Sequence, residues 1–233
     1  MLLDKVFLDI TGPEDIPTGG KSYALNLVDN ASRQTWIYFL AKKSDAATVF
    51  QEWQSLVKQE CGRKVGTFNT NNGDEYTSKE YESYLHCEGI THHMTSPNTS
   101  VENSISECSH CTIMSHARAI FLDAWMPPSL WAECAQAACY LKNCMPTRAL
   151  DEKTPHELWM GQKPNLVHLR ELGCHAFVLI QNHHNTKIYE QSIKCVLVGY
   201  LLNSKAYRCY DLAMGRIVIS WNVKFIEHKD DIP

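Results

Sequence analysis

The chain has 233 residues, of which 44% are hydrophobic, and its formal net charge at pH 7 is −4. That length and apolar content suffice for a full hydrophobic core and a second small module. No apolar run reaches the roughly 18 residues that a membrane span needs, so we expect an intracellular protein without membrane contact. The negative charge argues against a strong nonspecific hold on DNA, because that hold comes from Lys and Arg, so any nucleic-acid site must be local.

The ten cysteines are expected to be free thiols. Their spacing is scattered and the chain begins without a secretion signal, a combination that does not suggest a disulfide framework. Cys108 and Cys111, with His110 between them, look like half of a zinc site. Because no second half follows, we interpret them as two thiols on one turn of helix.

The first part of the chain alternates β-prone runs with helical patterns. The runs Y-A-L-N-L-V-D and Q-T-W-I-Y-F-L are joined by a short polar link that suits a hairpin, which Asp29 and Arg33 are predicted to stabilise as a pair. Ser44 can cap one helix, and Gly89 is a normal stop for another. We expect strands at 5–9, 23–29, 34–40, 65–71 and 90–94, and helices at 44–60 and 78–88.

Residues 95–103 have the composition of a loop, and a helix is predicted from Ile105 to about Leu122, with Glu107 near its start. A further helix is predicted at 129–143, before Pro146. Thr154 and Glu157 fit the capping pattern of a short helix. The order of strands and helices leaves several α/β folds open.

From about Val167 the pattern changes to short β runs separated by Asn, Gly and Asp, which is typical of a small barrel. The predicted runs are C-H-A-F-V-L-I, K-C-V-L-V-G-Y, A-Y-R-C-Y-D and G-R-I-V-I-S-W-N-V-K-F. We therefore expect two domains, at 1–163 and 164–233.

Three polar residues stand at or near the ends of predicted elements in the first domain. Asp9 ends the first strand, and Asn71 ends the strand that enters an Asn-Asn-Gly-Asp turn. Glu107 follows Asn71 after 35 intervening residues. A strand that enters such a turn is expected to deliver its last polar side chain to a cleft.

This triplet resembles the D, D-35-E arrangement of retroviral and retrotransposon integrases, with Asn71 in place of the second acid, and it is most similar to the copia-type branch. The later motifs resemble the SH3-like module that follows the integrase core in copia-type polyproteins; they lie at 161–164, 169–174, 198–200 and 207–211. The resemblance implies an RNase H-like mixed five-stranded sheet with flanking helices, plus a small C-terminal all-β SH3-like barrel. The family's zinc-binding module is expected to precede Met1.

The resemblance also implies roles for single residues. Asp9 and Glu107 would bind Mg²⁺ or Mn²⁺, and Asn71 would hold the second catalytic position without bringing charge, so metal binding is expected to be weakened. A loss of several kcal/mol in the binding of metal and transition state lowers the rate roughly 10²- to 10⁴-fold. Asp74 is expected to point elsewhere. The residues that the resemblance places on nucleic acid are Asn103, Ser104 and Arg118.

The partners implied are the element's DNA ends, target DNA and further copies of the chain, in the nucleus if integration is possible. Ser104 replaces a glycine of the family's pattern and Cys108 replaces an arginine, so enzyme activity stays an open question. The alternatives are a non-catalytic nucleic-acid-binding or assembly remnant, and a remnant without function. The tryptophans are expected to be packing residues; they are Trp36, Trp53, Trp125, Trp131, Trp159 and Trp221.

Overall fold

The computed structural model describes residues 1–12, 19–70, 79–94, 100–180, 191–201 and 204–227, with backbone only for 79–80 and 100–103. The chain divides into two compact units, and each is described by itself. The first comprises Met1–Met114 and Leu141–Pro164, and the second comprises Ser115–Tyr140 and Asn165–Pro233. The domain boundary expected between residues 163 and 164 stays a prediction.

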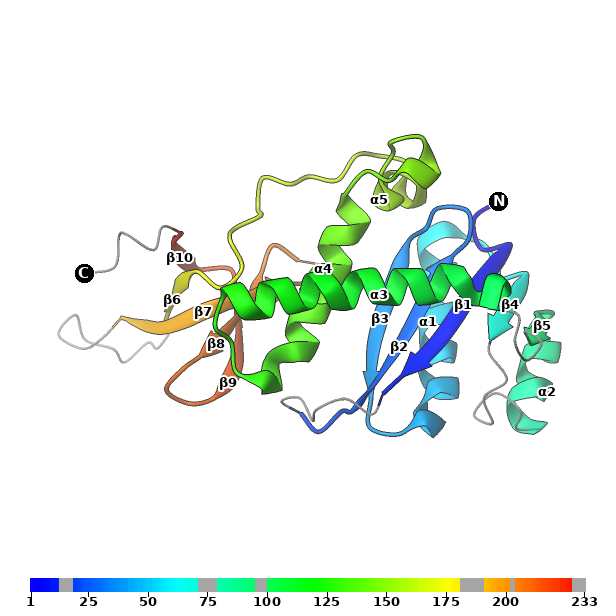
Figure 1. Cartoon of the computed structure of the whole chain (residues 1–233), viewed down its shortest axis with the longest axis horizontal. Coiled ribbons are helices and arrows are strands. Elements are labelled where there is room, and N and C mark those ends of the chain that lie inside the picture. Colours follow the sequence, from blue (N-terminus) through cyan, green and yellow to red (C-terminus); the bar gives the residue numbers. More distant parts are fainter. Residues whose placement is uncertain (13–18, 71–78, 95–99, 181–190, 202–203, 228–233) are drawn as a thin grey trace. The chain divides into compact units, whose positions relative to one another are not determined.

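The first unit contains the predicted mixed five-stranded sheet, with the strand order β3-β2-β1-β4-β5 (Figure 1). The first three strands pair antiparallel, whereas β4 runs parallel to β1 and β5 runs parallel to β4. This arrangement confirms the RNase H-like fold class. The strands are β1 (Lys5–Thr11), β2 (Tyr23–Asp29), β3 (Thr35–Leu40), β4 (Thr67–Thr70) and β5 (Thr91–Met94).

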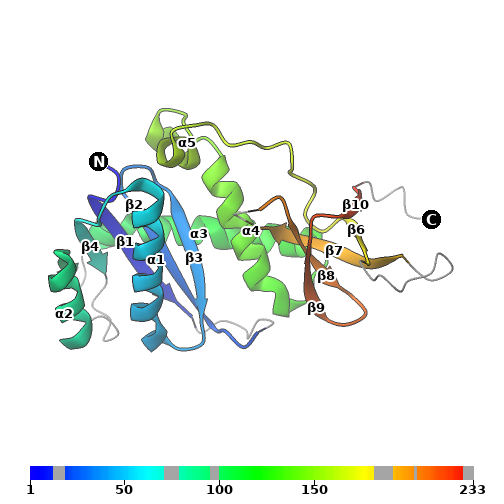
Figure 2. The same cartoon turned by 180° about the vertical axis from the view of Figure 1, so that it is seen from behind.

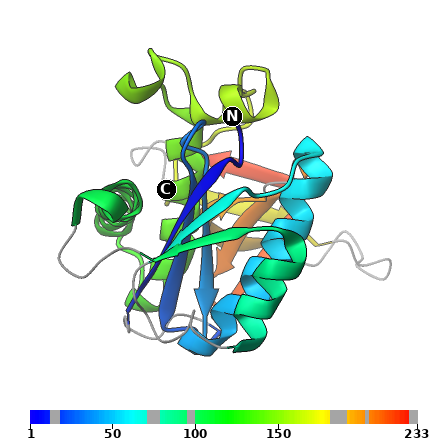
Figure 3. The same cartoon turned by 90° about the vertical axis from the view of Figure 1, so that its right-hand side faces the viewer.

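Helices cover both faces of this sheet, and Figure 3 shows α3 on one side with α1 and α2 on the other. Figure 2 shows α1 lying along the sheet. Alternate residues of β1 enter the core cluster on the α1 side, where Phe50 and Trp53 are fully buried, so the residues between them face α3. The helices are α1 (Ala46–Cys61), α2 (Lys79–Glu88), α3 (Ser100–Asp123), α4 (Trp131–Cys144) and α5 (Pro155–Met160).

Helix α3 begins at Ser100, earlier than the predicted start at Ile105, so Glu107 lies about two turns into the helix and not near its start. Ser and Asn differ from good helix formers by less than about 0.7 kcal/mol per residue, so packing easily outweighs their propensity. Other boundaries agree closely with the sequence. The Oγ1 of Thr154 caps α5 by accepting the Glu157 N–H at 2.9 Å.

The second unit contains an antiparallel five-stranded sheet with the order β10-β6-β7-β8-β9. Arg208 of β8 donates two hydrogen bonds to Glu133 of α4, at 2.7 and 2.6 Å. The last predicted run is wrong as a single strand, because the Oγ of Ser220 accepts the Asn222 N–H and turns the chain there. The strands are β6 (His175–Leu179), β7 (Ser192–Tyr200), β8 (Tyr207–Asp211), β9 (Arg216–Ser220) and β10 (Val223–Ile226).

The tryptophan prediction is partly wrong. Trp36, Trp53 and Trp159 form an edge-to-face cluster with ring centroids 4.9 and 5.3 Å apart, as expected of packing residues. Trp125 and Trp221 are instead 91% and 70% exposed. The ten cysteines are free, as predicted. No helix in the described part of the chain is long and apolar enough to span a membrane.

Asp29 and Arg33 are paired in the hairpin as predicted, through the main chain, where the Arg33 N–H donates to the Asp29 carbonyl at 2.9 Å. Both carboxylate oxygens of the buried Asp29 accept hydrogen bonds, from the Leu3 N–H at 2.8 Å and from Ser32 N–H and Oγ at 2.8 and 2.6 Å. The Arg33 guanidinium donates to the side chain of Asn30. Asp29 therefore joins the start of β1 to the turn after β2.

We expect Asp29→Ala to lower the free energy of unfolding by about 3 kcal/mol, since it leaves two buried N–H groups without an acceptor. Urea unfolding measures this change. Asp45→Ala is the matched control: Asp45 is exposed and accepts only the Lys42 N–H, so the loss there is expected to be about 1 kcal/mol or less. Equal losses in the two variants would contradict the role given to Asp29.

Candidate active site

Asp9 lies on the central strand of the first sheet, on the face that α3 covers. Its neighbours Leu8 and Ile10 belong to the core cluster on the other face, so the alternation of a strand directs Asp9 toward α3. The residue is 8% exposed, and its pairing partner on β2 is Asn26. A carboxylate is thus held near the middle of the sheet with little contact with water.

A series of polar contacts fixes the first half of α3 against the sheet (Figure 1). The Nδ2 of Asn26 donates to the Ser106 carbonyl at 3.2 Å. One turn further, Ser109 Oγ lies 3.3 Å from the hydroxyl of Thr35 on β3, and His110 Nε2 lies 3.0 Å from the hydroxyl of Thr11 on β1. We call these three contacts the polar seam; they fix the rotation of α3.

The polar seam brings Glu107 to the same face of the sheet as Asp9. Asp9 pairs with Asn26, Asn26 contacts Ser106, and Glu107 is the next residue along the helix. Because successive helical residues are turned by about 100°, Glu107 projects beside the seam, and its side chain is exposed. The arrangement pairs a buried carboxylate with a solvent-accessible one.

The other predicted site residues are placed only in part. Asn71 and Asp74 lie outside the described residues, as does the side chain of Asn103. Ser104 is exposed on the first turns of α3. Arg118 is exposed too, but it belongs to the second unit, so its predicted contact with nucleic acid stays a prediction.

Two buried amides on this face were missed by the sequence reasoning. Asn26 and Asn69 are 0% and 1% exposed, and within the described part of the chain the Oδ1 of Asn26 and both polar atoms of Asn69 lack a hydrogen-bond partner. Asn69 faces α3 because its neighbour Phe68 packs in the core on the opposite side. The signals in the sequence were the position of Asn26 between two leucines of its strand and the position of Asn69 two residues before Asn71.

The donor set suits a hard divalent cation, which prefers carboxylate and amide oxygens. Asp9 and Glu107 supply carboxylates, and the Oδ1 atoms of Asn26 and Asn69 supply neutral oxygens on the same face of the sheet. Within the described residues, His, Cys, Asp and Glu side chains form no group of three that could hold a metal. The face therefore offers oxygen ligands but little negative charge.

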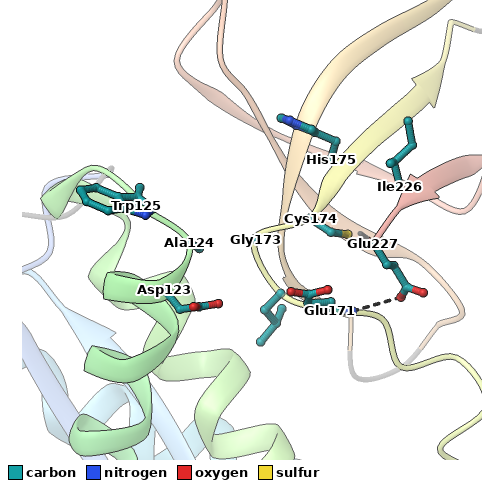
Figure 4. Close-up of a pocket in the computed structure, with 10 residues that line it drawn as sticks. Asp123, Ala124, Trp125, Glu171, Gly173, Cys174, His175, Ile226 and Glu227 are labelled. Carbon is teal, nitrogen blue, oxygen red and sulfur yellow. Dashed lines mark hydrogen bonds between the residues drawn. The ribbon is translucent and has the colours of Figure 1, made fainter. Parts of the chain in front are cut away.

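The second unit contains a separate cavity of about 340 Å³. Figure 4 shows the carboxylates of Asp123 and Glu171 on its two sides, and the Glu171 N–H donates to Glu227 at 3.2 Å. Burial raises the pKa of the Cys174 thiol to about 12, so this thiol is not a nucleophile at neutral pH. Three carboxylates in the lining make the cavity unsuitable for phosphate groups.

The comparisons with known proteins match two segments of the chain to known domains. Residues 3–100 match the model of the integrase core domain, and residues 174–232 match the retroviral polymerase SH3-like domain. The chain is 36% identical over 227 residues, 97% of its length, to the retrovirus-related Pol polyprotein from transposon TNT 1-94 of Nicotiana tabacum. It is 29% identical over 225 residues, also 97% of its length, to that from transposon RE2 of Arabidopsis thaliana.

The chain is a copia-type integrase core followed by an SH3-like domain. Among solved structures, a chain of the simian T-cell lymphotropic virus intasome in complex with PP2A regulatory subunit B56 gamma has the same fold, with a TM-score of 0.56 and 14% identity. That match covers 97% of this chain and 80% of the other. Integrase cores as a family use divalent metal ions.

This integrase core and SH3-like domain correspond to a small part of the related polyproteins. The chain spans 17% of the length of the TNT 1-94 polyprotein and 15% of the RE2 polyprotein. The comparisons therefore establish which segment of such a polyprotein the chain resembles.

In the integrase core, His92 of β5 supports the end of β4. Its Nε2 lies 2.9 Å from the hydroxyl of the buried Thr70, and its ring packs on Phe68 with centroids 5.8 Å apart. Burial lowers the pKa of His92 below its ordinary value of 6.5. Thr70 is the last residue of β4, so this contact supports the strand that leads to Asn71.

Because the folded pKa of His92 lies below the unfolded value, the folded core disfavours the protonated ring. Its contribution to stability is complete above about pH 6.5 and decreases as the pH falls through the lower, folded pKa. We expect His92→Gln to reduce the loss of stability between about pH 7.5 and pH 5.5, measured by urea unfolding at both values. Burial also lowers the pKa of His156, so part of the pH dependence of stability should remain in the variant. An unchanged difference between the two pH values would contradict the prediction.

Proposed function

We propose that this chain is the catalytic segment of a DNA-integrating transferase whose phosphodiester strand transfer is impaired because Asn71 replaces the second acid. Its partners would be element ends, target DNA and further copies of the chain, and integration would take place in the nucleus. The metal would be Mg²⁺ or Mn²⁺, bound more weakly than by three acids. The matches to integrase cores and Pol polyproteins support this reaction class.

The observation that carries the proposal is the position of Asp9 on the central strand, under the helix that bears Glu107. Asp9 pairs with Asn26, and Asn26 holds the carbonyl of Ser106, one residue before Glu107. Transfer to a phosphodiester requires acidic oxygens from separate elements converging at one place, so that divalent ions can be held in fixed positions. A strand and a helix supply two such oxygens here.

Asp9, Glu107 and Asn71 would have different roles in the reaction. The buried Asp9 carboxylate would hold the cations, and the exposed Glu107 would complete the site on the side that substrate phosphate reaches. When bound, divalent ions supply activation of the attacking hydroxyl and neutralise charge on the phosphate. The amide of Asn71 can offer a carbonyl oxygen but no charge, so the site holds one negative charge fewer than three acids would give.

A non-catalytic nucleic-acid-binding or assembly remnant is the second candidate. The feature that favours it is the shortage of charge: the described residues supply two acids on this face, and the third position in the sequence is an amide. In this case the fold would remain as a docking surface after losing the reaction. DNA binding without turnover is its signature.

We expect Asn71→Asp to restore Mn²⁺-dependent strand transfer on short DNA ends, with a rate roughly 10²- to 10⁴-fold above the unmodified chain. The same change is expected to lower the melting temperature without metal, because like carboxylates repel. A gel assay of joined DNA and a thermal unfolding curve measure the two effects.

The matched control adds Glu107→Gln to Asn71→Asp, which should abolish the restored reaction and leave the fold intact. If Asn71→Asp binds DNA and Mn²⁺ but joins no ends, the remnant is the better description. If melting temperature and Mn²⁺ binding both stay unchanged, residue 71 does not belong to a metal site.

A further inference from the structure

Two buried carboxamides lie on the same face of the sheet as Asp9, and some of their polar atoms have no hydrogen-bond partner among the described residues. The Nδ2 of Asn26 is used by the Ser106 carbonyl, which fixes the amide and leaves its Oδ1 as an acceptor without a donor. Asn69 is 1% exposed and both of its polar atoms lack partners. Buried polar groups are nearly always hydrogen-bonded, so each exception calls for a water, an ion or a function.

These amides share one face of the sheet with the Asp9 carboxylate. Asn26 is the pairing partner of Asp9 on β2, and Asn69 on β4 pairs with Phe7, two residues before Asp9 on the same face of β1. Asn26 therefore lies directly opposite Asp9, and Asn69 lies on the strand at the other side, diagonal to Asp9. Both amides lie away from the core cluster around α1.

We infer that Asn26 and Asn69 are neutral oxygen ligands of a divalent cation held by Asp9. A hard cation requires several oxygen ligands, and amide oxygens serve as well as carboxylates for coordination, although they contribute no charge. The inference deepens the proposed function, on which it rests, because it adds two ligands to the cation site of the integrase core. It also gives a role to two buried amides whose polar atoms lack partners among the described residues.

The low charge of this ligand set determines what it should bind. One carboxylate with two amides favours cations that tolerate irregular oxygen coordination, so Mn²⁺ and Ca²⁺ should bind better than Mg²⁺, which demands regular geometry. Affinity rises with the number of charged ligands, and we expect roughly millimolar dissociation constants for the unmodified chain.

Asn69→Leu and Asn69→Asp test the inference through Mn²⁺ binding, measured by calorimetry and by the Mn²⁺-dependent rise in melting temperature. Asn69→Leu has nearly the same size and removes both unpartnered atoms, so it should melt higher without metal and bind Mn²⁺ about tenfold more weakly. Asn69→Asp should melt lower without metal and bind Mn²⁺ about tenfold more tightly.

Gln34→Leu is the matched control, because Gln34 carries another buried unpartnered amide oxygen but lies at the turn before β3. It should leave Mn²⁺ binding unchanged. Mn²⁺ affinity that is equal in Asn69→Leu, Asn69→Asp and the unmodified chain would overturn the inference, as a buried water alone would explain the amides. Because the readout is metal binding, its failure is distinct from failure of the proposed function, which is read from DNA joining by Asn71→Asp.

Discussion

The polar seam between α3 and the sheet is the contact on which the candidate site depends. A helix packed on a sheet by apolar side chains alone can rotate or slide by small amounts, whereas hydrogen bonds between α3 and the side chains of Asn26, Thr35 and Thr11 fix one rotation of α3. Glu107 directly follows Ser106, whose carbonyl accepts the hydrogen bond from Asn26, the pairing partner of Asp9. The seam therefore combines the side-chain alternation of β1 with the helical periodicity of α3, so that the polar residues of both elements lie on one face of the sheet.

Folding of the first unit does not depend on the negative charge of the candidate site. The core lies on the other side of the sheet, around Phe50 and Trp53, and does not depend on the acids. Exchanging a carboxylate for an amide lowers repulsion among acids and so does not endanger folding. In our account, stability and the two-domain organisation persist in this chain while its catalytic charge is reduced.

Local patterns predicted the elements whose signals are local. The strands of the hairpin and the cap at Thr154 were predicted correctly because alternation and capping depend on neighbouring residues. The early start of α3 was missed because the stretch 100–104 contains Ser and Asn, whose weak helix propensity is outweighed by packing. The roles of Asn26 and Asn69 depend on strand pairing between distant segments, which a single sequence does not reveal, and the exposure of Trp125 depends on tertiary packing in the same way.

The measurement that tests the central claim most directly is anomalous X-ray diffraction from crystals of the Asn71→Asp variant soaked in Mn²⁺. The account predicts an anomalous peak within about 2.5 Å of carboxylate oxygens of Asp9 and of residue 71, with Glu107 on the same side of the sheet. It would be contradicted by Mn²⁺ bound only elsewhere on the chain, or by Asp9 and Glu107 on opposite faces of the sheet.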